Sequence, residues 1–227
     1  MKTNKRPFSI ALKRLLGIAL AIAAVIGMTV FSAQAAPANL QTILNSVKLE
    51  PVSTGNSKYD AKLQSIVGTG STYDRVLRGY TWLAKTMVYD KLSPVDTTGK
   101  YWLDIAYGPL FTQRGSCSSS SAAVNLMLRY IGLPNVLRVE GMIVNSNGLP
   151  QYHIWNVVTL NGVSYIVDAQ VEGRVYSRQG GGNMRYLYFF ASPWSLRSSP
   201  TYLPARILFE NGSKLRHLSM VLFGLHR

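Results

Sequence analysis

The chain has one cysteine, Cys117, and three histidines, of which only His153 lies away from the C-terminal end. Cys117 follows Gly115-Ser116 and precedes a run of small residues, a pattern that predicts a helix starting at the cysteine. Backbone N–H groups and the dipole at a helix N-terminus favour a thiolate. A thiolate, an imidazole base and a carboxylate that orients the imidazole together perform covalent acyl transfer. The elements that carry His153 and a carboxylate therefore decide whether Cys117 can act as a nucleophile.

Two β-rich runs, residues 153–160 and 163–168, are joined by Asn-Gly, the strongest short signal for a hairpin. A two-residue turn sets a register in which Trp155 faces Asp168. Because side chains alternate between the two faces of a strand, His153 and Asp168 then share a face as diagonal neighbours. A four-residue loop keeps this arrangement, whereas a three-residue loop would place the two residues on opposite faces. The hairpin therefore predicts a hydrogen bond between His153 and Asp168.

The N-terminal segment has the three parts of a secretory signal peptide. Residues 2–14 carry five basic residues and no acid, residues 15–30 are apolar or small, and residues 31–37 contain an Ala-x-Ala type site. We predict cleavage after Ala35. The alternative is an uncleaved anchor helix, although the 16-residue apolar stretch is short compared with the roughly 20 residues that span a bilayer. We expect a secreted or cell-envelope protein.

The net charge of +14 is partly that of the signal peptide, and loss of its five basic residues leaves +9. The remaining basic residues are scattered, without a helix-turn-helix, zinc-finger or RNA-binding signature, so we expect no nucleic-acid partner. Anionic wall polymers, phospholipid head groups or acidic substrates fit this charge, and solubility alone explains it equally well. The single cysteine excludes a disulfide framework and a Cys-rich zinc site. We expect no metal and no other cofactor.

Each candidate catalytic residue also has an ordinary structural explanation. A single cysteine is often a small buried hydrophobic residue, a strand histidine is more often structural, and Asp168 could simply end its strand. An unpaired thiol in an exported protein, however, requires either a partner chain or a reactive role. The conjunction of the three residues favours catalysis.

Hydrophobic periodicity predicts the elements that position these residues. Helices are expected at 39–49, near 59–67, at 72–88 after a capping box, and at 118–131. The last is apolar on most faces and should be a buried central helix. Further strands are expected at 136–143 and 186–190, and a long connection with little regular structure at 91–115. The apolar segments 206–209 and 218–225 should pack on the domain.

At these residues the chain resembles the transglutaminase-like superfamily, papain-related cysteine enzymes that include bacterial secreted members. The resemblance covers about residues 72–170, and the order Cys, His, Asp with gaps of 36 and 15 residues fits it. The matching segments are Gly115-Ser116-Cys117 with Ala122-Ala123, Ile131-Gly132-Leu133-Pro134 leading to Val139 and Gly141, His153-Ile154-Trp155-Asn156, and Val167-Asp168-Ala169.

The resemblance implies an α+β fold in which a central helix bearing the cysteine packs on an antiparallel sheet bearing the histidine and the aspartate. It implies that Cys117 is the nucleophile, His153 the general base and acid, and Asp168 the orienting acid. The family's oxyanion side chain lies upstream of the cysteine. Candidates for oxyanion or substrate contacts are Gln113, Tyr101, Trp102 and Trp155. Ser118–Ser121 departs from the acidic or aromatic residue common in the family, which leaves the choice of substrate open.

We expect an exported, monomeric enzyme that hydrolyses or transfers peptide or protein amides, with cell-wall material among the candidate substrates. Water and an amine are both open as the acceptor, because the sequence does not show how the site is hydrated. The alternative is a catalytically inactive extracellular or cell-wall binding module of the same fold. We divide the chain into a signal peptide (1–35), an N-terminal extension (36–71), a catalytic core (72–195) and a C-terminal segment packed on the core (196–227).

Overall fold

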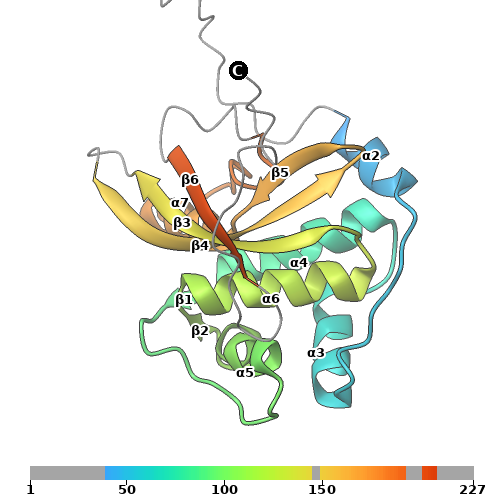
Figure 1. Ribbon diagram of the computed structural model, residues 1–227, viewed down its shortest axis with the longest axis horizontal. Coiled ribbons are helices and arrows are strands. Elements are labelled where there is room, and N and C mark those ends of the chain that lie inside the picture. The colour runs from blue at the N-terminus through green and yellow to red at the C-terminus, as the bar shows by residue number, and fades with distance from the viewer. Residues whose placement is uncertain (1–38, 145–148, 193–200, 209–227) are drawn as a thin grey trace, which may run out of the picture. The chain divides into compact units, whose positions relative to one another are not determined.

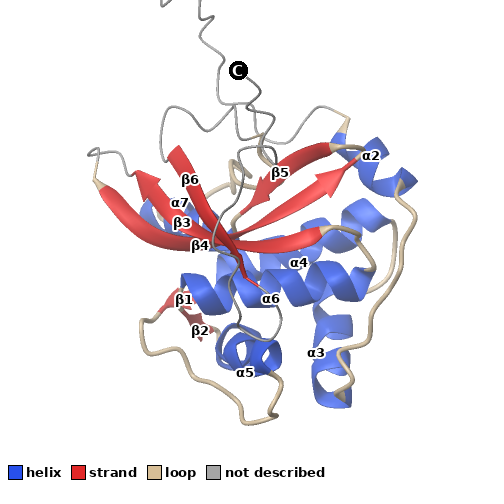
Figure 2. Cartoon of the chain, viewed as in Figure 1, coloured by secondary structure: helices blue, strands red, loops and turns tan. Residues whose placement is uncertain are grey.

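A computed structural model of the chain describes residues 39–144, 149–192 and 201–208. Most of the helices gather on one side of an antiparallel sheet whose strand order is β5-β4-β3-β6 (Figures 1 and 2). The predicted signal peptide and the apolar segment 218–225 lie outside the described residues. The elements are α2 (Leu40–Ser46), α3 (Ser57–Val67), α4 (Thr72–Thr86), β1 (Val88–Tyr89), α5 (Tyr101–Tyr107), the π-helical turn η1 (Gly108–Thr112), β2 (Arg114–Gly115), α6 (Cys117–Ile131), β3 (Val136–Val144), β4 (Pro150–Leu160), β5 (Val163–Val167), α7 (Ala169–Arg178) and β6 (Thr201–Leu208).

The β4–β5 hairpin has the predicted two-residue turn and the predicted register. Asn161 and Gly162 have φ values of 51° and 78°, the left-handed conformation that a tight hairpin turn of this kind requires. Pairing runs from Leu160 with Val163 to Asn156 with Val167. Because β5 ends at Val167, the first half of β4 has no strand partner on this side among the described residues. This unpaired edge of β4 precedes Asn156, and α7 begins two residues after the last paired residue of β5.

Helix α6 is the buried central helix that its apolar sequence predicts. It begins at Cys117, where Ser116 and Ser119 form a capping box, and it ends before Gly132, whose φ of 108° is left-handed. Figure 1 shows α6 lying across one face of the sheet. Its core neighbours on that face include Val158 and Leu160 of β4.

The opposite face of the sheet carries a second, smaller core. Trp155 and Val157 of β4 lie there with Val139 of β3, as the alternation of side chains requires. Val171 of α7 packs against the same cluster. The first turn of α7 thus contributes to both cores, because Ala169 belongs to the main core that contains α6.

Helix α7 was not expected from the sequence, and it packs closely against α4. Gly173 lies at this contact, because a Cβ atom at this position would come within 2.6 Å of the carbonyl oxygen of Ala84. The absence of a side chain at Gly173 lets the two helices approach to backbone contact. This packing fixes the start of α7 relative to the rest of the domain.

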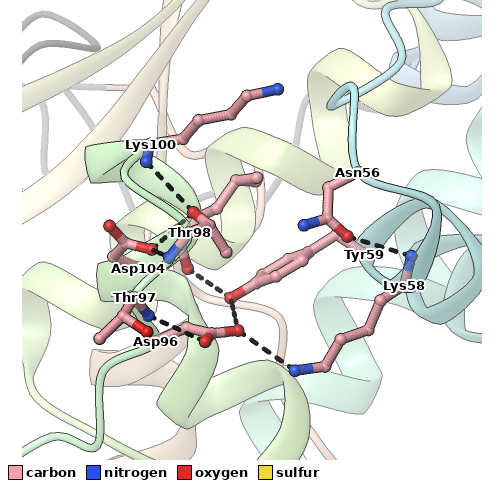
Figure 3. A network of polar contacts seen from close by, with 9 residues as sticks. Asn56, Lys58, Tyr59, Asp96, Thr97, Thr98, Lys100 and Asp104 are labelled. Carbon is pink, nitrogen blue, oxygen red and sulfur yellow. Dashed lines mark hydrogen bonds and ion pairs between the residues drawn. The ribbon is translucent and has the colours of Figure 1, made fainter.

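The expectation of a long irregular connection at 91–115 is wrong, because this segment contains α5, the π-helical turn and β2. Its start is tied to α3 by a polar network (Figure 3). The Tyr59 hydroxyl lies 2.9 Å from the carbonyl oxygen of Leu103 and 3.2 Å from a carboxylate oxygen of Asp96, which also pairs with Lys58 at 3.1 Å. These contacts join residues about forty positions apart, so local patterns in the sequence do not reveal them.

The expectation of a strand at 186–190 is also wrong. Tyr186 and Phe190 have positive φ values of 54° and 51°, so the chain turns there, and only Ala191 makes a bridge, to Ile166 of β5. Tyr188, Phe189 and Phe190 are nevertheless buried. The β-rich composition of this run reflects burial of aromatic side chains rather than pairing in a ladder.

Strand β6 adds a fourth strand on the far side of β3 and contains most of the apolar segment 206–209 that was expected to pack on the domain. No helix in the described part of the chain is long and apolar enough to cross a membrane.

Candidate active site

The start of α6 is held by a group of serines around Cys117. The backbone N–H of Ser116 lies 2.6 Å from the Ser93 hydroxyl and 2.8 Å from the Ser119 hydroxyl. A Cβ atom on Gly115 would come within 2.5 Å of the Ser119 hydroxyl oxygen, so glycine is needed immediately before the cap. These contacts fix the backbone that presents Cys117.

A buried arginine joins the first turn of α6 to the sheet. Arg138 of β3 donates hydrogen bonds to the Ser121 hydroxyl at 3.0 Å and to the Ser118 carbonyl at 2.8 Å. Its guanidinium stacks on Trp102, with 3.9 Å between the guanidinium carbon and the ring centroid. Burial lowers the pKa of Arg138 to about 9, although charges including that of Cys117 oppose the shift. The serine run, which departs from the family pattern, therefore holds a cation against the first turn of α6, which carries Cys117.

His153 and Asp168 form the hydrogen bond that the hairpin register predicts. The Nε2 atom of His153 lies 2.5 Å from Oδ2 of Asp168, and both side chains are buried. Asp168 is also the N-cap of α7, because its Oδ1 accepts hydrogen bonds from the backbone N–H groups of Gln170 and Val171 at 3.1 Å. The carboxylate that orients the imidazole is therefore fixed by the helix that follows it.

The two groups favour each other's charged forms. Burial lowers the pKa of His153, but the Asp168 carboxylate and the Cys117 thiol outweigh burial and raise this pKa to about 10. Burial raises the pKa of Asp168, but the charge and hydrogen bond of His153 outweigh it and hold this pKa below its usual value. The pair is consequently an imidazolium and a carboxylate at neutral pH.

Two tyrosines that sequence reasoning missed support Asp168. The hydroxyl of Tyr202 in β6 donates to Oδ2 of Asp168 at 2.8 Å. The hydroxyl of Tyr80 in α4 lies 3.2 Å from both the Asp168 carbonyl and a carboxylate oxygen of the buried Glu172. Neither tyrosine is near Asp168 in the sequence, so only the pairing of distant elements reveals them.

Trp155 supports the imidazole rather than lining the cleft. It is fully buried, and its ring lies roughly parallel to that of His153, with 6.1 Å between ring centroids and 16° between ring planes. Tyr202 packs edge-on against Trp155 at 5.0 Å. The two aromatic rings restrict the orientation of the His153 side chain.

Cys117 and His153 line one cleft of about 600 Å³. Its other lining residues are Tyr89, Ile143, Gln151, Tyr152, Gln170 and Arg174. Nε2 of His153 is taken by Asp168, which leaves Nδ1 for the thiol. His153 lies in the part of β4 that β5 does not pair with, since that pairing ends at Asn156 and Val167. The thiol at the start of α6 meets the imidazole there. The structure thus brings together Cys117, His153 and Asp168.

Three other sequence candidates lie outside this cleft. Gln113 is exposed and has a left-handed backbone, with φ of 56°, and its carbonyl accepts a hydrogen bond from the backbone of Val88. Tyr101 and Trp102 line a separate cavity of about 520 Å³. The structure does not bring these residues to the Cys117 cleft.

Gln170 and Arg174 are cleft residues that sequence reasoning missed. They lie on α7, four positions apart, and the sequence analysis assigned no element to that segment. Their helical spacing was the available signal. Within the described ranges, no group of three or more histidine, cysteine, aspartate or glutamate side chains could hold a metal ion.

The sequence model of the transglutaminase-like superfamily matches residues 60–169. The chain is a member of the transglutaminase-like superfamily. The match spans α4, α6 and the β4–β5 hairpin, and it ends one residue after Asp168. This member of the superfamily has its mixed α and β fold, with the cysteine helix packed on an antiparallel sheet as expected.

Two solved structures are similar to parts of this superfamily member. A candidate cysteine protease from Cytophaga hutchinsonii is 18% identical, with a TM-score of 0.40 over 59% of this chain and 43% of that chain. A TGase is 21% identical, with a TM-score of 0.36 over 55% of this chain and 35% of that chain. The chain therefore aligns with less than half the length of either protein. No curated protein matches the chain.

Proposed function

We propose that the chain is an exported, thiol-dependent acyl-transfer enzyme that acts on peptide or protein amide bonds through Cys117, His153 and Asp168. The observation that carries this proposal is a single cleft lined by Cys117 and by a His153 ring whose other nitrogen is bound to a buried carboxylate. In a catalytic triad the base lies between the nucleophile and the orienting acid, and His153 lies in this way between Cys117 and Asp168.

In the first half of the reaction, the Cys117 sulfur attacks the carbonyl carbon of the substrate amide and forms a C–S bond. His153, protonated at neutral pH because of Asp168, favours the thiolate beside it. The imidazolium then donates its proton to the amide nitrogen as the C–N bond breaks. The amine leaves, and the acyl group remains on Cys117 as a thioester.

In the second half, the neutral imidazole of His153 accepts a proton from water or an amine, which attacks the thioester carbon. The C–S bond breaks, and the thiolate and the imidazolium are restored. Asp168 and Tyr202 keep the imidazole in one orientation through both halves. The backbone N–H of Cys117 at the start of α6 is the candidate donor to the negative oxygen of the intermediate.

The N-terminal sequence supports the proposal of export. Five basic residues, an apolar stretch and a small-residue site precede the described domain. We propose that residues 1–35 direct export and are removed, and that the enzyme acts on substrates outside the cytoplasm.

The experiment that tests the proposed chemistry uses p-nitrophenyl acetate, whose acyl group can transfer to any reactive thiolate. We expect a burst of about one equivalent of nitrophenol per protein and an acetyl group on Cys117 by mass spectrometry. His153→Gln should abolish the burst while the protein stays folded, and Cys117→Ala is the control for background release. A folded wild-type protein that leaves Cys117 unacetylated would instead support the inactive binding module.

Adding a primary amine to the same assay separates the two acceptor reactions. Formation of the acetylated amine in competition with acetate shows transfer, and acetate alone shows hydrolysis.

A further inference from the structure

One face of α7 lines the cleft beside the nucleophile. Gln170 and Arg174 are four positions apart, so they lie one above the other on the same side of the helix. Both border the cleft that contains Cys117 and His153. An amide and a guanidinium are thus placed next to the reacting groups by a single rigid element.

The Gln170 residue is almost entirely buried, and its side chain borders the cleft. Only 5% of the residue is exposed, and among the described residues its side chain makes no hydrogen bond. Because no described residue occupies this amide, it is open to the cleft as a hydrogen-bond donor and acceptor. A ligand in the cleft can supply the missing hydrogen bond.

Arg174 gives the cleft a positive wall. It is exposed, and it forms no ion pair or hydrogen bond with any residue that the structure describes. The cleft lining contains no acidic side chain, and the imidazolium of His153 adds to its positive charge. A guanidinium presents parallel N–H groups that match the two oxygens of a carboxylate.

The acids near this face are engaged by other groups. Glu140 accepts a hydrogen bond from the hydroxyl of the cleft residue Tyr152 at 2.6 Å. Asp168 is occupied by His153 and Tyr202, and Glu172 is buried against Tyr80 and the backbone N–H of Tyr188. The N-terminal end of α7 adds the positive end of its helix dipole to the same region. The cleft therefore presents donors and positive charge to whatever enters it.

We propose that Gln170 and Arg174 form a subsite that binds a carboxylate of the substrate next to the reacting amide. The substrates are then peptides that carry either an acidic side chain or a free terminal carboxylate beside the bond that Cys117 attacks. This inference rests on the proposed acyl-transfer function, because it places the carboxylate relative to that nucleophile.

The test compares alkylation of Cys117 by iodoacetate, which carries a carboxylate, with alkylation by the neutral iodoacetamide. The rate with iodoacetate divided by the rate with iodoacetamide should fall about threefold to tenfold in Arg174→Gln, a change typical of a partly exposed charge interaction. Gln170→Leu should lower the same ratio, and Arg174→Lys should restore part of it. The wild-type ratio should decline as salt is added.

Arg178→Gln is the matched control, because it removes the same charge from an exposed position one turn further along α7 and outside the cleft lining. A ratio that falls equally in Arg174→Gln and Arg178→Gln would overturn the subsite. His153→Gln keeps the two proposals apart, since loss of iodoacetamide reactivity in that variant supports the catalytic pair whatever the ratio does.

Protection of Cys117 against iodoacetamide distinguishes the two sources of carboxylate. The probes are N-acetyl-Ala-Glu-amide, N-acetyl-Ala-Ala with a free terminal carboxylate, and N-acetyl-Ala-Ala-amide. If the glutamate peptide protects at a lower concentration than the neutral peptide, the subsite binds an acidic side chain. If the peptide with a free terminus does so, the subsite binds a terminal carboxylate. Equal protection by all three, or a preference that survives in Arg174→Gln, would contradict the proposal.

Discussion

At the scale of residues, the charges of His153 and Asp168 make the stability of the fold depend on pH. The raised pKa of His153 means that its stabilising contribution is complete below its unfolded pKa of about 6.5 and is lost as pH rises through about 10. The lowered pKa of Asp168 means that its contribution is present above its ordinary pKa and is lost as pH falls below it. The pair should therefore stabilise the protein most between about pH 4 and 6.5.

Urea unfolding of the wild type and of His153→Gln between pH 5 and 10 checks this expectation. The difference in unfolding free energy between the two proteins should shrink steadily from pH 6.5 to 10, because the wild type loses the imidazolium. A difference that stays constant over this range would show that His153 is not held in its charged form.

Tyr202 is a positioning residue, because it reaches the reacting groups only through Asp168. Tyr202→Phe removes one hydrogen bond to a buried carboxylate and should slow the acetylation of Cys117 by about tenfold, the usual worth of a hydrogen bond to a charged group. The upper limit of the pH–rate profile should also move to lower pH, since a less well-held Asp168 supports the imidazolium less. Tyr188→Phe, a nearby buried tyrosine whose hydroxyl makes no hydrogen bond to any described residue, is the control.

How much of the site follows from the sequence depends on how far apart its parts lie. The contact of His153 with Asp168 was predictable because a two-residue turn fixes every pair along the hairpin. Tyr202 was not predictable, because β6 reaches the site through pairing with β3, some sixty positions earlier, and no local pattern states which strands pair. Gln170 and Arg174 were missed because no element was assigned to the segment after Asp168, where α7 begins.

At the scale of elements, the position of α7 relative to α4 controls both Asp168 and the cleft wall. Gly173→Ala would press a methyl group into the Ala84 carbonyl and should lower the unfolding free energy by about 1–3 kcal/mol, the cost of overpacking. Gly182→Ala is the control, since a Cβ at Gly182 meets nothing within 4 Å. Equal stability of the two variants in urea unfolding would show that α4 and α7 do not pack as closely as described.

The same scale shows where hydrophobic patterns inform and where they mislead. The helix that presents Cys117 was predictable, because the Gly115-Ser116 start, the small residues after the cysteine and a run that is apolar on most faces agree with each other. Residues 186–190 misled because aromatic side chains favour burial, whether or not the backbone joins a sheet. Helix α5 was hidden because its segment is held by contacts with α3 rather than by a strong periodicity of its own.

At the scale of the whole molecule, the sheet extends beyond the part of the chain that matches the superfamily. The match ends at residue 169, whereas β6 pairs with β3 at residues 201–208 and supplies Tyr202 to the site. Helices α2 and α3, which lie in the predicted N-terminal extension, contribute Leu44 and Leu63 to the main core. Both flanking segments therefore pack on the predicted catalytic core.

A chain that ends at residue 200 tests this dependence on β6. Removal of β6 exposes an edge of β3 and leaves Asp168 without the Tyr202 hydroxyl, so we expect lower thermal stability and loss of Cys117 acetylation relative to a chain that ends at residue 208. If the shorter chain kept the melting temperature and the acetylation rate of the longer one, β6 would be dispensable for the site.

The central claim is that His153 makes Cys117 a nucleophile. The most direct measurement is the rate of Cys117 alkylation by iodoacetamide between pH 4 and 10 in the wild type, His153→Gln and Asp168→Asn. The account predicts rapid alkylation of the wild type at neutral pH and a rate at least tenfold lower in His153→Gln, with Asp168→Asn between them. Wild-type and His153→Gln rates that coincide across this pH range would contradict it.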